Sequence, residues 1–351
     1  MKQFILIFIL ILLLKVQLTA ELRKDLVDIV NVETSSIHIK IAQEIKADSN
    51  FIIVFRLTSQ PAIPPKLEKK YSLSDSFLSG DTSSTTGEGN YIIYLDSLKY
   101  DFTYGNLSPD TYYNIDIYHK KKDEYYLNAT IPITTLAELP ERQTQRIMWA
   151  EQTHNSFKII ASGGTGKSVL IALSSSPNDF VPVAGVSYKA DSCFGKGSEP
   201  VEGVFIVLSE DSIKTVEITN LESGTYYYIT TFEYNGKAKS CNYLTETVKL
   251  KNAIRITTLL ETPELLSVKK VGEKNMNVVW KEVNGAKTYI VELAHDPNFE
   301  VMEETYGAFD LGILSEYLFE ELPVNKKYYV RVRATNGTIS STYSDVLSID
   351  L

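Results

Sequence analysis

A glycine-rich stretch is the part of this sequence that most resembles a chemical site. Gly163–Ser168 reads GGTGKS and follows an apolar run, so it imitates the loop that binds nucleotide phosphates. A true phosphate-binding loop has a further glycine where this chain has Ala161. A helix also follows it, so that amide groups at the helix N-terminus face the phosphates. Here the next residues, Val169–Leu173, have the composition of a strand. We therefore interpret the stretch as a hairpin turn and not as a nucleotide site.

Other residues capable of catalysis or metal binding are scattered along the chain. The four histidines have no partner at the spacing of metal ligands, and neither a nucleophile elbow nor a cysteine–histidine pair is evident. The sequence thus predicts no catalytic residue, no cofactor site and no metal site. A pair of catalytic carboxylates usually cannot be recognised in a single sequence. The histidines are His38, His119, His154 and His295.

The two cysteines, Cys193 and Cys241, lie in the middle third of the chain. An even number of cysteines in an exported chain favours a disulfide bond, and we expect these two to pair. A loop of about 50 residues closed in this way would stabilise the fold by roughly 4 kcal/mol on the loop-entropy model. The alternative is two unpaired thiols.

A short sequence pattern recurs three times and indicates a repeated structural unit. The pattern is a leucine, a polar turn and a tyrosine that opens an alternating strand. Successive copies are separated by about the length of one immunoglobulin-like sandwich, roughly 100 residues. The copies are Leu107–Tyr113, Leu221–Tyr227 and Leu322–Tyr328. The sequence therefore predicts an all-β chain of three tandem β-sandwiches.

A second repeat supports the same division. Gly89–Leu107 aligns with Gly203–Leu221 without a gap, and the strands that close the two units also match. Pro140 and Pro263 follow those closing strands, and a proline cannot extend a strand ladder. We therefore predict modules at residues 21–138, 139–261 and 262–351. The polar segment Ser79–Gly89 is expected to be a mobile loop that buries nothing.

These features resemble the fibronectin type III family. The three tyrosines, Tyr113, Tyr227 and Tyr328, are similar to the "tyrosine corner" of that family, in which the hydroxyl bonds to the chain just upstream. Residues 147–248, with the sequence FEYNG at Phe232–Gly236, resemble modules of secreted proteins from Bacteroidetes-type bacteria. Trp280 lies on an early strand of the third module, where such sandwiches bury a tryptophan. The resemblance implies a modular exported protein and does not imply an activity.

The N-terminus and the composition indicate the location. Residues 1–20 have a short basic head, an apolar run and a small residue at the end, as in a cleaved signal peptide. The apolar run is too short for a typical membrane span, so an uncleaved signal would be the only membrane anchor. The net charge of −9 argues against nucleic acid and against an acidic membrane surface as partners. We expect a secreted, extracellular or cell-surface protein.

Three functions remain open at this point. The first is a non-enzymatic array for adhesion, protein interaction or spacing, which binds a protein or a glycan at the cell surface. The second is a carbohydrate-binding protein that serves polysaccharide degradation, and the third is a hydrolase with an unrecognised site. Recognition in such sandwiches is carried by loops. The equivalent loops after the three tyrosine-bearing strands are His119–Tyr126, Gly236–Cys241 and Asn336–Ser341.

Overall fold

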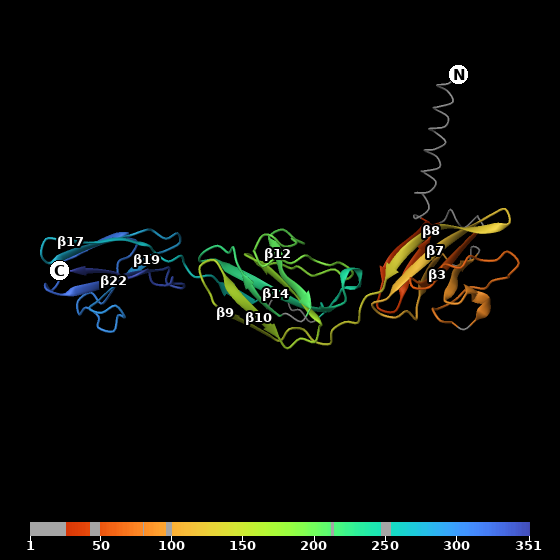
Figure 1. Ribbon diagram of the computed structural model, residues 1–351, viewed down its shortest axis with the longest axis horizontal. Helices are drawn as coiled ribbons and strands as arrows, with labels where there is room; N and C mark the ends of the chain where they lie inside the picture. The colour runs from red at the N-terminus through yellow and green to blue at the C-terminus, as the bar shows by residue number, and fades with distance from the viewer. Residues whose placement is uncertain (1–25, 43–49, 80, 96–99, 212–213, 247–253) are drawn as a thin grey trace, which may run out of the picture. The chain divides into compact units, whose positions relative to one another are not determined.

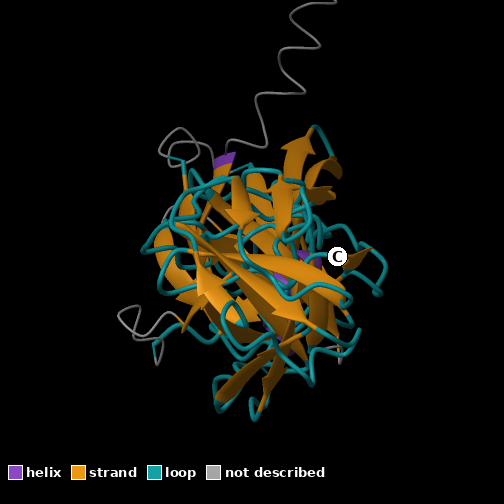
Figure 2. Ribbon diagram, turned by 90° about the vertical axis from the view of Figure 1, so that its left-hand side faces the viewer, coloured by secondary structure: helices purple, strands orange, loops and turns teal. Residues whose placement is uncertain are grey.

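The computed structural model describes residues 26–42, 50–79, 81–95, 100–211, 214–246 and 254–351. In these ranges the chain consists of β-strands, short 3-10 turns and loops (Figure 2). The predicted all-β class is confirmed. No helical segment in the part of the chain that the structure describes has the length and apolar character to cross a bilayer. The predicted signal peptide, residues 1–20, lies outside the described residues.

The first sandwich pairs two antiparallel sheets around one core (Figure 1). The small sheet has the order β1-β2-β6 and the large sheet has the order β4-β5-β3-β7-β8. Their facing sides bury Ile37, Phe55 and Tyr113, among others. The strands are β1 (Val27–Val32), β2 (Ile37–Ile41), β3 (Phe51–Leu57), β4 (Thr85–Gly87), β5 (Asn90–Leu95), β6 (Asp101–Tyr104), β7 (Tyr112–Lys121) and β8 (Glu124–Thr134).

The second pair of sheets repeats this arrangement. Its small sheet has the order β13-β10-β9, and its large sheet has the order β12-β11-β14-β15, with β16 also paired to β14. The shared core includes Phe157, Leu173 and Tyr227. The strands are β9 (Arg146–Ala150), β10 (Phe157–Ser162), β11 (Ser168–Ser174), β12 (Val204–Asp211), β13 (Thr215–Ile218), β14 (Tyr226–Asn235), β15 (Asn242–Tyr243) and β16 (Ile254–Thr257).

The third pair of sheets is the shortest in sequence. Its small sheet has the order β17-β18-β21 and its large sheet has the order β20-β19-β22-β23. Trp280 on β18 is 1% exposed in the core between them, as the sequence predicts. The strands are β17 (Leu265–Val271), β18 (Asn275–Trp280), β19 (Thr288–Ala294), β20 (Ala308–Asp310), β21 (Glu316–Phe319), β22 (Lys327–Thr335) and β23 (Leu347–Asp350).

By its packing the chain divides into two compact units. One comprises residues 1–140, 182–187 and 234–243, and the other comprises residues 141–181, 188–233 and 244–351. The first unit therefore includes two short segments that the sequence assigns to the second module. The number of domains that fold independently and the boundaries after residues 138 and 261 stay predictions.

The three tyrosines of the repeated pattern have equivalent environments. All three side chains are buried, and each hydroxyl bonds to the backbone five residues upstream. The bonds join Tyr113 to the amide of Ser108 at 2.9 Å, Tyr227 to the amide of Glu222 at 2.8 Å, and Tyr328 to the carbonyl oxygen of Pro323 at 2.9 Å. This is the geometry that the repeated pattern predicts. Because a buried hydroxyl without a partner is costly, the bond fixes the turn before each strand.

The large sheets differ in how their outer faces, turned away from the core, are covered. On β22 burial alternates strictly, whereas β3 and β11 are buried on both faces. The first excursion is the chain between β3 and β4, described at residues 58–79 and 81–84. Its Tyr71 and Leu73 pack on the outer face of the first large sheet. Residues 175–203 form the second excursion, between β11 and β12. The corresponding connection in the third sandwich, between β19 and β20, is only residues 295–307.

Candidate functional site: a groove on the first sandwich

The first of the three predicted recognition loops lines the groove that we take as the candidate site. Residues 119–126 form the ends of β7 and β8 and the tight turn between them, where Lys122 has a positive φ of 56°. Residues 123–125 form one wall of an open groove of about 750 Å³, and residues 64–69 of the first excursion form the other wall. The hairpin tip and the excursion are thus brought together.

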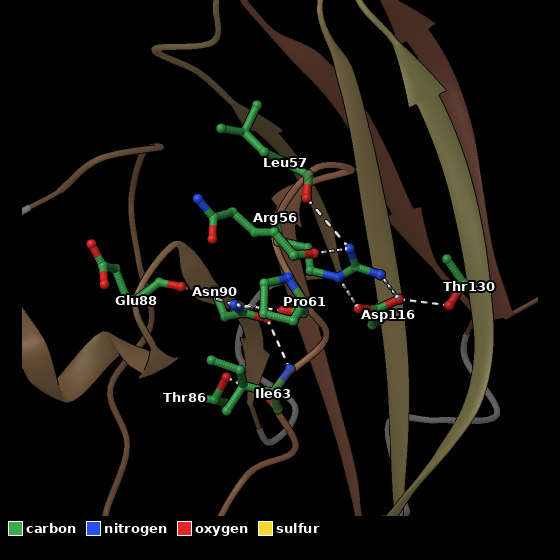
Figure 3. Close-up of polar contacts among 10 residues, drawn as sticks. Arg56, Leu57, Pro61, Ile63, Thr86, Glu88, Asn90, Asp116 and Thr130 are labelled. Atoms are coloured by element: carbon green, nitrogen blue, oxygen red, sulfur yellow. Dashed lines mark hydrogen bonds and ion pairs between the residues drawn. The ribbon is translucent and has the colours of Figure 1, made fainter.

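A buried ion pair underlies the start of the first excursion (Figure 3). Arg56 on β3 and Asp116 on β7 are 7% and 0% exposed, and Arg56 Nε donates to Asp116 Oδ2 at 2.6 Å. Thr130 on β8 donates to the other carboxylate oxygen at 2.6 Å. Arg56 Nη1 also donates to the carbonyl oxygen of Gln60 at 2.5 Å. The ion pair therefore joins three strands of the sheet to the first turn of the excursion.

The amide of Asn90 fixes the next part of the excursion. Asn90 on β5 is fully buried, and its side chain donates to the carbonyl oxygens of Pro61 and Glu88 at 3.1 and 3.0 Å (Figure 3). It also accepts from the Ile63 amide at 3.2 Å. These bonds hold the chain that leads directly into the groove wall at Pro64.

The far part of the excursion is more ordered than the sequence suggests. The predicted loop Ser79–Gly89 contains a 3-10 turn at Thr82–Ser84 and then β4, with Ser84 and Thr86 buried. Hydrogen bonds from Ser83 lower the pKa of the Asp81 carboxyl, which caps the turn. The prediction of a loop that buries nothing is wrong here, because each buried hydroxyl has a backbone acceptor. Gly80 itself lies outside the described residues.

Lysine and tyrosine side chains support the excursion wall. Lys69 Nζ donates to the carbonyl oxygens of Thr82 and Thr85 at 3.0 and 2.9 Å and lies 5.0 Å from the ring centroid of Tyr71. The hydroxyl of Tyr71 accepts from the Lys66 amide at 2.8 Å. The charge of Lys69 is therefore already engaged within the wall.

The groove offers a tyrosine ring and charges of both signs. Tyr125 is half-buried, and it packs with Tyr71 against a small apolar cluster on the outer face of the sheet. Burial, with a smaller contribution from Tyr71, raises the pKa of Tyr125, so its hydroxyl remains a hydrogen-bond donor at neutral pH. Lys66, Glu68 and Asp123 are exposed along the walls. Such a surface can form hydrogen bonds and a ring contact with a ligand, but it aligns no nucleophile with a base.

The glycine-rich stretch Gly163–Ser168 is occupied by a carboxylate of the protein itself. Glu233 on β14 is 0% exposed, and its Oε2 accepts from the Gly166 amide at 3.0 Å and from Lys214 at 2.7 Å. Thr144 donates to Oε1 at 2.6 Å. The amide that would face a phosphate in a nucleotide site therefore faces a buried carboxylate. Two anions at this position would repel each other strongly at low dielectric.

The connection through this stretch also differs from the predicted hairpin. β10 pairs with β9 and β13 in the small sheet, whereas β11 pairs with β12 in the large sheet. The stretch therefore crosses from one sheet to the other. The interpretation as a turn between strands and not a helix start is confirmed, but the hairpin is wrong. An apolar run such as Val169–Leu173 indicates a strand and does not reveal which sheet it joins.

The other two predicted recognition loops have different surroundings. In Gly236–Cys241, Ser240 and Cys241 are buried, and only Lys237–Lys239 are exposed. Asn336–Ser341 is a tight turn in which the Asn336 side chain accepts from the amides of Thr338 and Ile339 at 3.0 and 2.9 Å. The equivalent positions of the three loops along the chain thus do not give them equivalent surfaces.

Cys193 and Cys241 are not joined by a disulfide bond in the structure. Cys193 is half-buried, and its backbone bridges to Thr219. Cys241 is buried, and its carbonyl oxygen accepts from the Gly185 amide at 2.8 Å. The structure holds no bond between the two sulfur atoms, and the pairing that the sequence favours stays a prediction.

Three of the four histidines, His38, His119 and His295, make contacts with other side chains. His38 bonds to Asp101 at 2.6 Å, and His119 stacks on Phe51 with ring centroids 4.5 Å apart. His295 bonds to the buried Glu303 at 3.1 Å. In the described ranges no group of three His, Cys, Asp or Glu residues is placed to hold a metal ion.

Residues near the predicted first joint are held within the first unit. The Ala137 amide donates to the carbonyl oxygen of Ser240 at 2.9 Å, and the Ala137 carbonyl accepts from Asn242 Nδ2 at 2.7 Å. Asn235 donates to the carbonyl oxygen of Glu138 at 2.7 Å. A free linker would have none of these bonds, so the backbone at this joint is restrained.

Replacing Asn242 with alanine should therefore loosen this joint. The Ala137 carbonyl would lose a buried donor, which costs about 1–3 kcal/mol. Limited proteolysis with a glutamate-specific protease should then cleave after Glu138 faster than in the wild-type protein. Asn298→Ala, at an exposed asparagine of the third sandwich, is the matched control. Equal cleavage rates for all three proteins would show that these bonds do not protect the joint.

Comparison with known proteins shows similarity only at the level of structure. No family model and no curated protein matches the chain. A two-domain fibronectin type III segment of chicken tenascin is 14% identical, with a TM-score of 0.36, over 60% of this chain and 100% of its own. Domains FN1–FN3 of chicken CNTN1 are 12% identical, with a TM-score of 0.28, over 92% and 96%. A variant named FN3tt is 24% identical, with a TM-score of 0.20, over 25% and 94%.

Proposed function

We propose that this protein is an exported, non-enzymatic binding and spacing protein that meets a cell-surface partner through the groove on its first sandwich. The observation that carries this proposal is the groove itself. Two segments far apart in sequence, residues 64–69 and 123–125, form its walls. The excursion wall is held by the buried Arg56–Asp116 pair and by Asn90. A rigid support for exposed polar and aromatic groups is what a recognition site requires.

The buried polar groups support binding rather than turnover. Asp116 and Glu233 are the least exposed carboxylates among the described residues, and each is bonded to a cation and to a hydroxyl. A general acid or base must reach the proton that it transfers. These two carboxylates instead hold strands and loops together, which accounts for their burial without catalysis.

A carbohydrate ligand remains the second candidate. Tyr125 beside Lys66 and Asp123 gives the groove a ring and polar groups of the kind that bind sugars. However, two exposed tyrosines of this sheet, Tyr112 and Tyr126, lie at opposite ends of the β7–β8 ladder. They do not form the flat row that would favour a polysaccharide surface. We therefore place a protein partner first.

A binding experiment with a groove variant tests the proposal. The full chain is immobilised and exposed to arrays of purified cell-surface proteins and of glycans. Tyr125→Ala should reduce retention of the bound partner at least about tenfold, because aromatic anchors dominate binding energy. Tyr112→Ala, at a tyrosine that is 60% exposed and outside the groove, is the matched control and should bind like the wild-type protein.

The outcomes of this experiment separate the candidates. Retention of proteins alone supports the first proposal, and retention of glycans alone supports the second. If Tyr125→Ala and Tyr112→Ala weaken retention equally, the groove is not the binding site. A chain that retains neither class would be a spacer without a binding site of its own.

A further inference from the structure

The outer face of the large sheet in the third sandwich is less covered along β22 than the outer faces of its counterparts are along β3 and β11. In the first sandwich the excursion buries β3 on both faces, and in the second sandwich β11 is likewise buried on both faces. In the third sandwich β22 alternates between buried and half-buried residues along its whole length. The short connection 295–307 covers one end of this face, where Phe299 packs on Arg331, and Arg333 and Ile290 are half-buried.

Cationic and aromatic side chains dominate this face along β22. The residues that point outward are every second one, and Lys327, Tyr329, Arg331 and Arg333 are four of them. Ile290 on the neighbouring strand β19 lies directly opposite Arg333 and is half-buried. β22 thus carries three cations on this face in a protein whose net charge is −9.

Arg331 is held rigidly within this face. Its guanidinium pairs with Glu292 through Nε at 2.7 Å and Nη2 at 2.5 Å. It also lies between two rings, 3.9 Å from the centroid of Phe299 and 4.0 Å from that of Tyr343. The Tyr343 hydroxyl donates to the other oxygen of Glu292, and burial followed by this bond raises the pKa of Tyr343. Both oxygens of Glu292 are therefore occupied.

Arg333 has no such acid partner. Its guanidinium lies 5.1 Å from the ring centroid of Tyr343, and its Nε is buried with no hydrogen-bond partner among the residues that the structure describes. Glu292 is already used by Arg331 and Tyr343. The nearest acid in register is Asp310, which lies opposite Ile290 on the far side of β19 from Arg333. Asp310 already accepts from Thr288 and from the Gly312 amide. A partly desolvated guanidinium without a counter-ion is costly and calls for an explanation.

We propose that this face, defined by Arg333, Tyr343, Arg331 and Ile290, is a docking surface for an acidic protein segment. Arg333 would form charge-assisted hydrogen bonds with a partner carboxylate through its outward nitrogens. The ring of Tyr343 and the side chain of Ile290 would pack against an adjoining apolar group. Arginine and tyrosine are both enriched among the residues that contribute most to binding at protein interfaces. This surface is a second binding site, on a different sandwich from the groove, and does not depend on the groove.

Binding of an acidic polypeptide tests this proposal. The probe is fluorescein-labelled poly-L-glutamate, measured by fluorescence anisotropy with the full chain, and labelled heparin is measured in parallel. Poly-L-glutamate should bind the wild-type protein, and Arg333→Gln should weaken the affinity at least about tenfold, because a charge-assisted contact at an interface centre is lost. Lys269→Gln, at an exposed lysine on the other sheet of the same sandwich, is the matched control and should change the affinity less than twofold, as expected of a screened surface charge.

A second measurement needs no variant. Hydrogen exchange of the wild-type chain with added poly-L-glutamate should slow along β19 and β22 and leave β17 unchanged. The proposal is overturned if poly-L-glutamate does not bind, or if Lys269→Gln weakens binding as much as Arg333→Gln. It is also overturned if heparin alone binds in an Arg333-dependent way, because the partner would then be an anionic polysaccharide. Loss of binding by Tyr125→Ala but not by Arg333→Gln would assign the probe to the groove instead.

Discussion

Replacing Asp116 with alanine is expected to lower the free energy of unfolding by about 3–5 kcal/mol, because it leaves a buried arginine without its counter-ion. Arg56 is 7% exposed, and its Nε donates to this carboxylate at 2.6 Å. The hydroxyl of Thr130 would also lose its acceptor. Chemical denaturation of the full chain, followed by tyrosine and tryptophan fluorescence, measures the change.

The control for Asp116→Ala is an exposed ion pair of similar geometry. Lys274 and Glu321 are joined at 3.1 Å, and their side chains are 55% and 79% exposed. Glu321→Ala should change stability by less than about 1 kcal/mol, because water screens such pairs. Replacing Arg56 and Asp116 together with methionine and leucine should recover much of the loss. If Asp116→Ala were as mild as Glu321→Ala, the ion pair would not be what anchors the excursion.

Replacing Gly164 with alanine should destabilise the second sandwich by a similar amount, about 3–5 kcal/mol, because it expels a buried carboxylate from its partners. A Cβ at this position would lie 2.0 Å from the carboxyl carbon of Glu233 and 2.1 Å from its Oε1. Glu233 cannot move aside freely, because Lys214 and the Gly166 amide both hold its Oε2. Thermal unfolding monitored by circular dichroism measures the effect.

Gly105→Ala is the matched control for this substitution. A Cβ on Gly105 would meet no atom within 4 Å, and its φ is not in the left-handed region. This variant should lie within about 1 kcal/mol of the wild-type protein, on either side. If Gly164→Ala proved equally mild, Glu233 would not be pinned in the glycine-rich stretch, and the stretch would be open to another anion.

The scaffold could be predicted from the sequence because its signals are local. The leucine-to-tyrosine pattern recurs at Tyr113, Tyr227 and Tyr328, and each hydroxyl needs only a backbone group five residues away. The alternation of apolar and polar residues along β10 and β22 likewise predicts which face of each strand is buried. Structural features that depend only on residues close together in the sequence can therefore be predicted from the sequence.

The candidate site could not be predicted in the same way, because its parts are distant in sequence. His119–Tyr126 was identified as a recognition loop, but residues 64–69, which complete the groove, have no motif. Nothing near Gly166 in sequence indicates that Glu233 would bond to it. Polar segments such as Ser79–Gly89 also read as loops, although tertiary acceptors can bury their hydroxyl groups.

Two ion pairs on equivalent strands of the first and third sandwiches have opposite signs, which bears on how tandem copies avoid misfolding with one another. Asp116 and Arg331 each stand three residues after the corner tyrosine, on β7 and β22, and their partners Arg56 and Glu292 lie on the equivalent strands β3 and β19. Glu292 lies directly opposite Arg331, whereas Val54 lies opposite Asp116 and Arg56 lies opposite Asn114. If β3 exchanged into the third sandwich, Arg56 would therefore lie diagonally from Arg331, and the reverse exchange would place Glu292 opposite Asp116. Like charges brought together in a partly desolvated site repel each other, so we expect each sandwich to disfavour the other's strand. Neighbouring repeats in one chain are at high local concentration and are prone to such exchange, and this charge inversion makes correct pairing the favoured outcome.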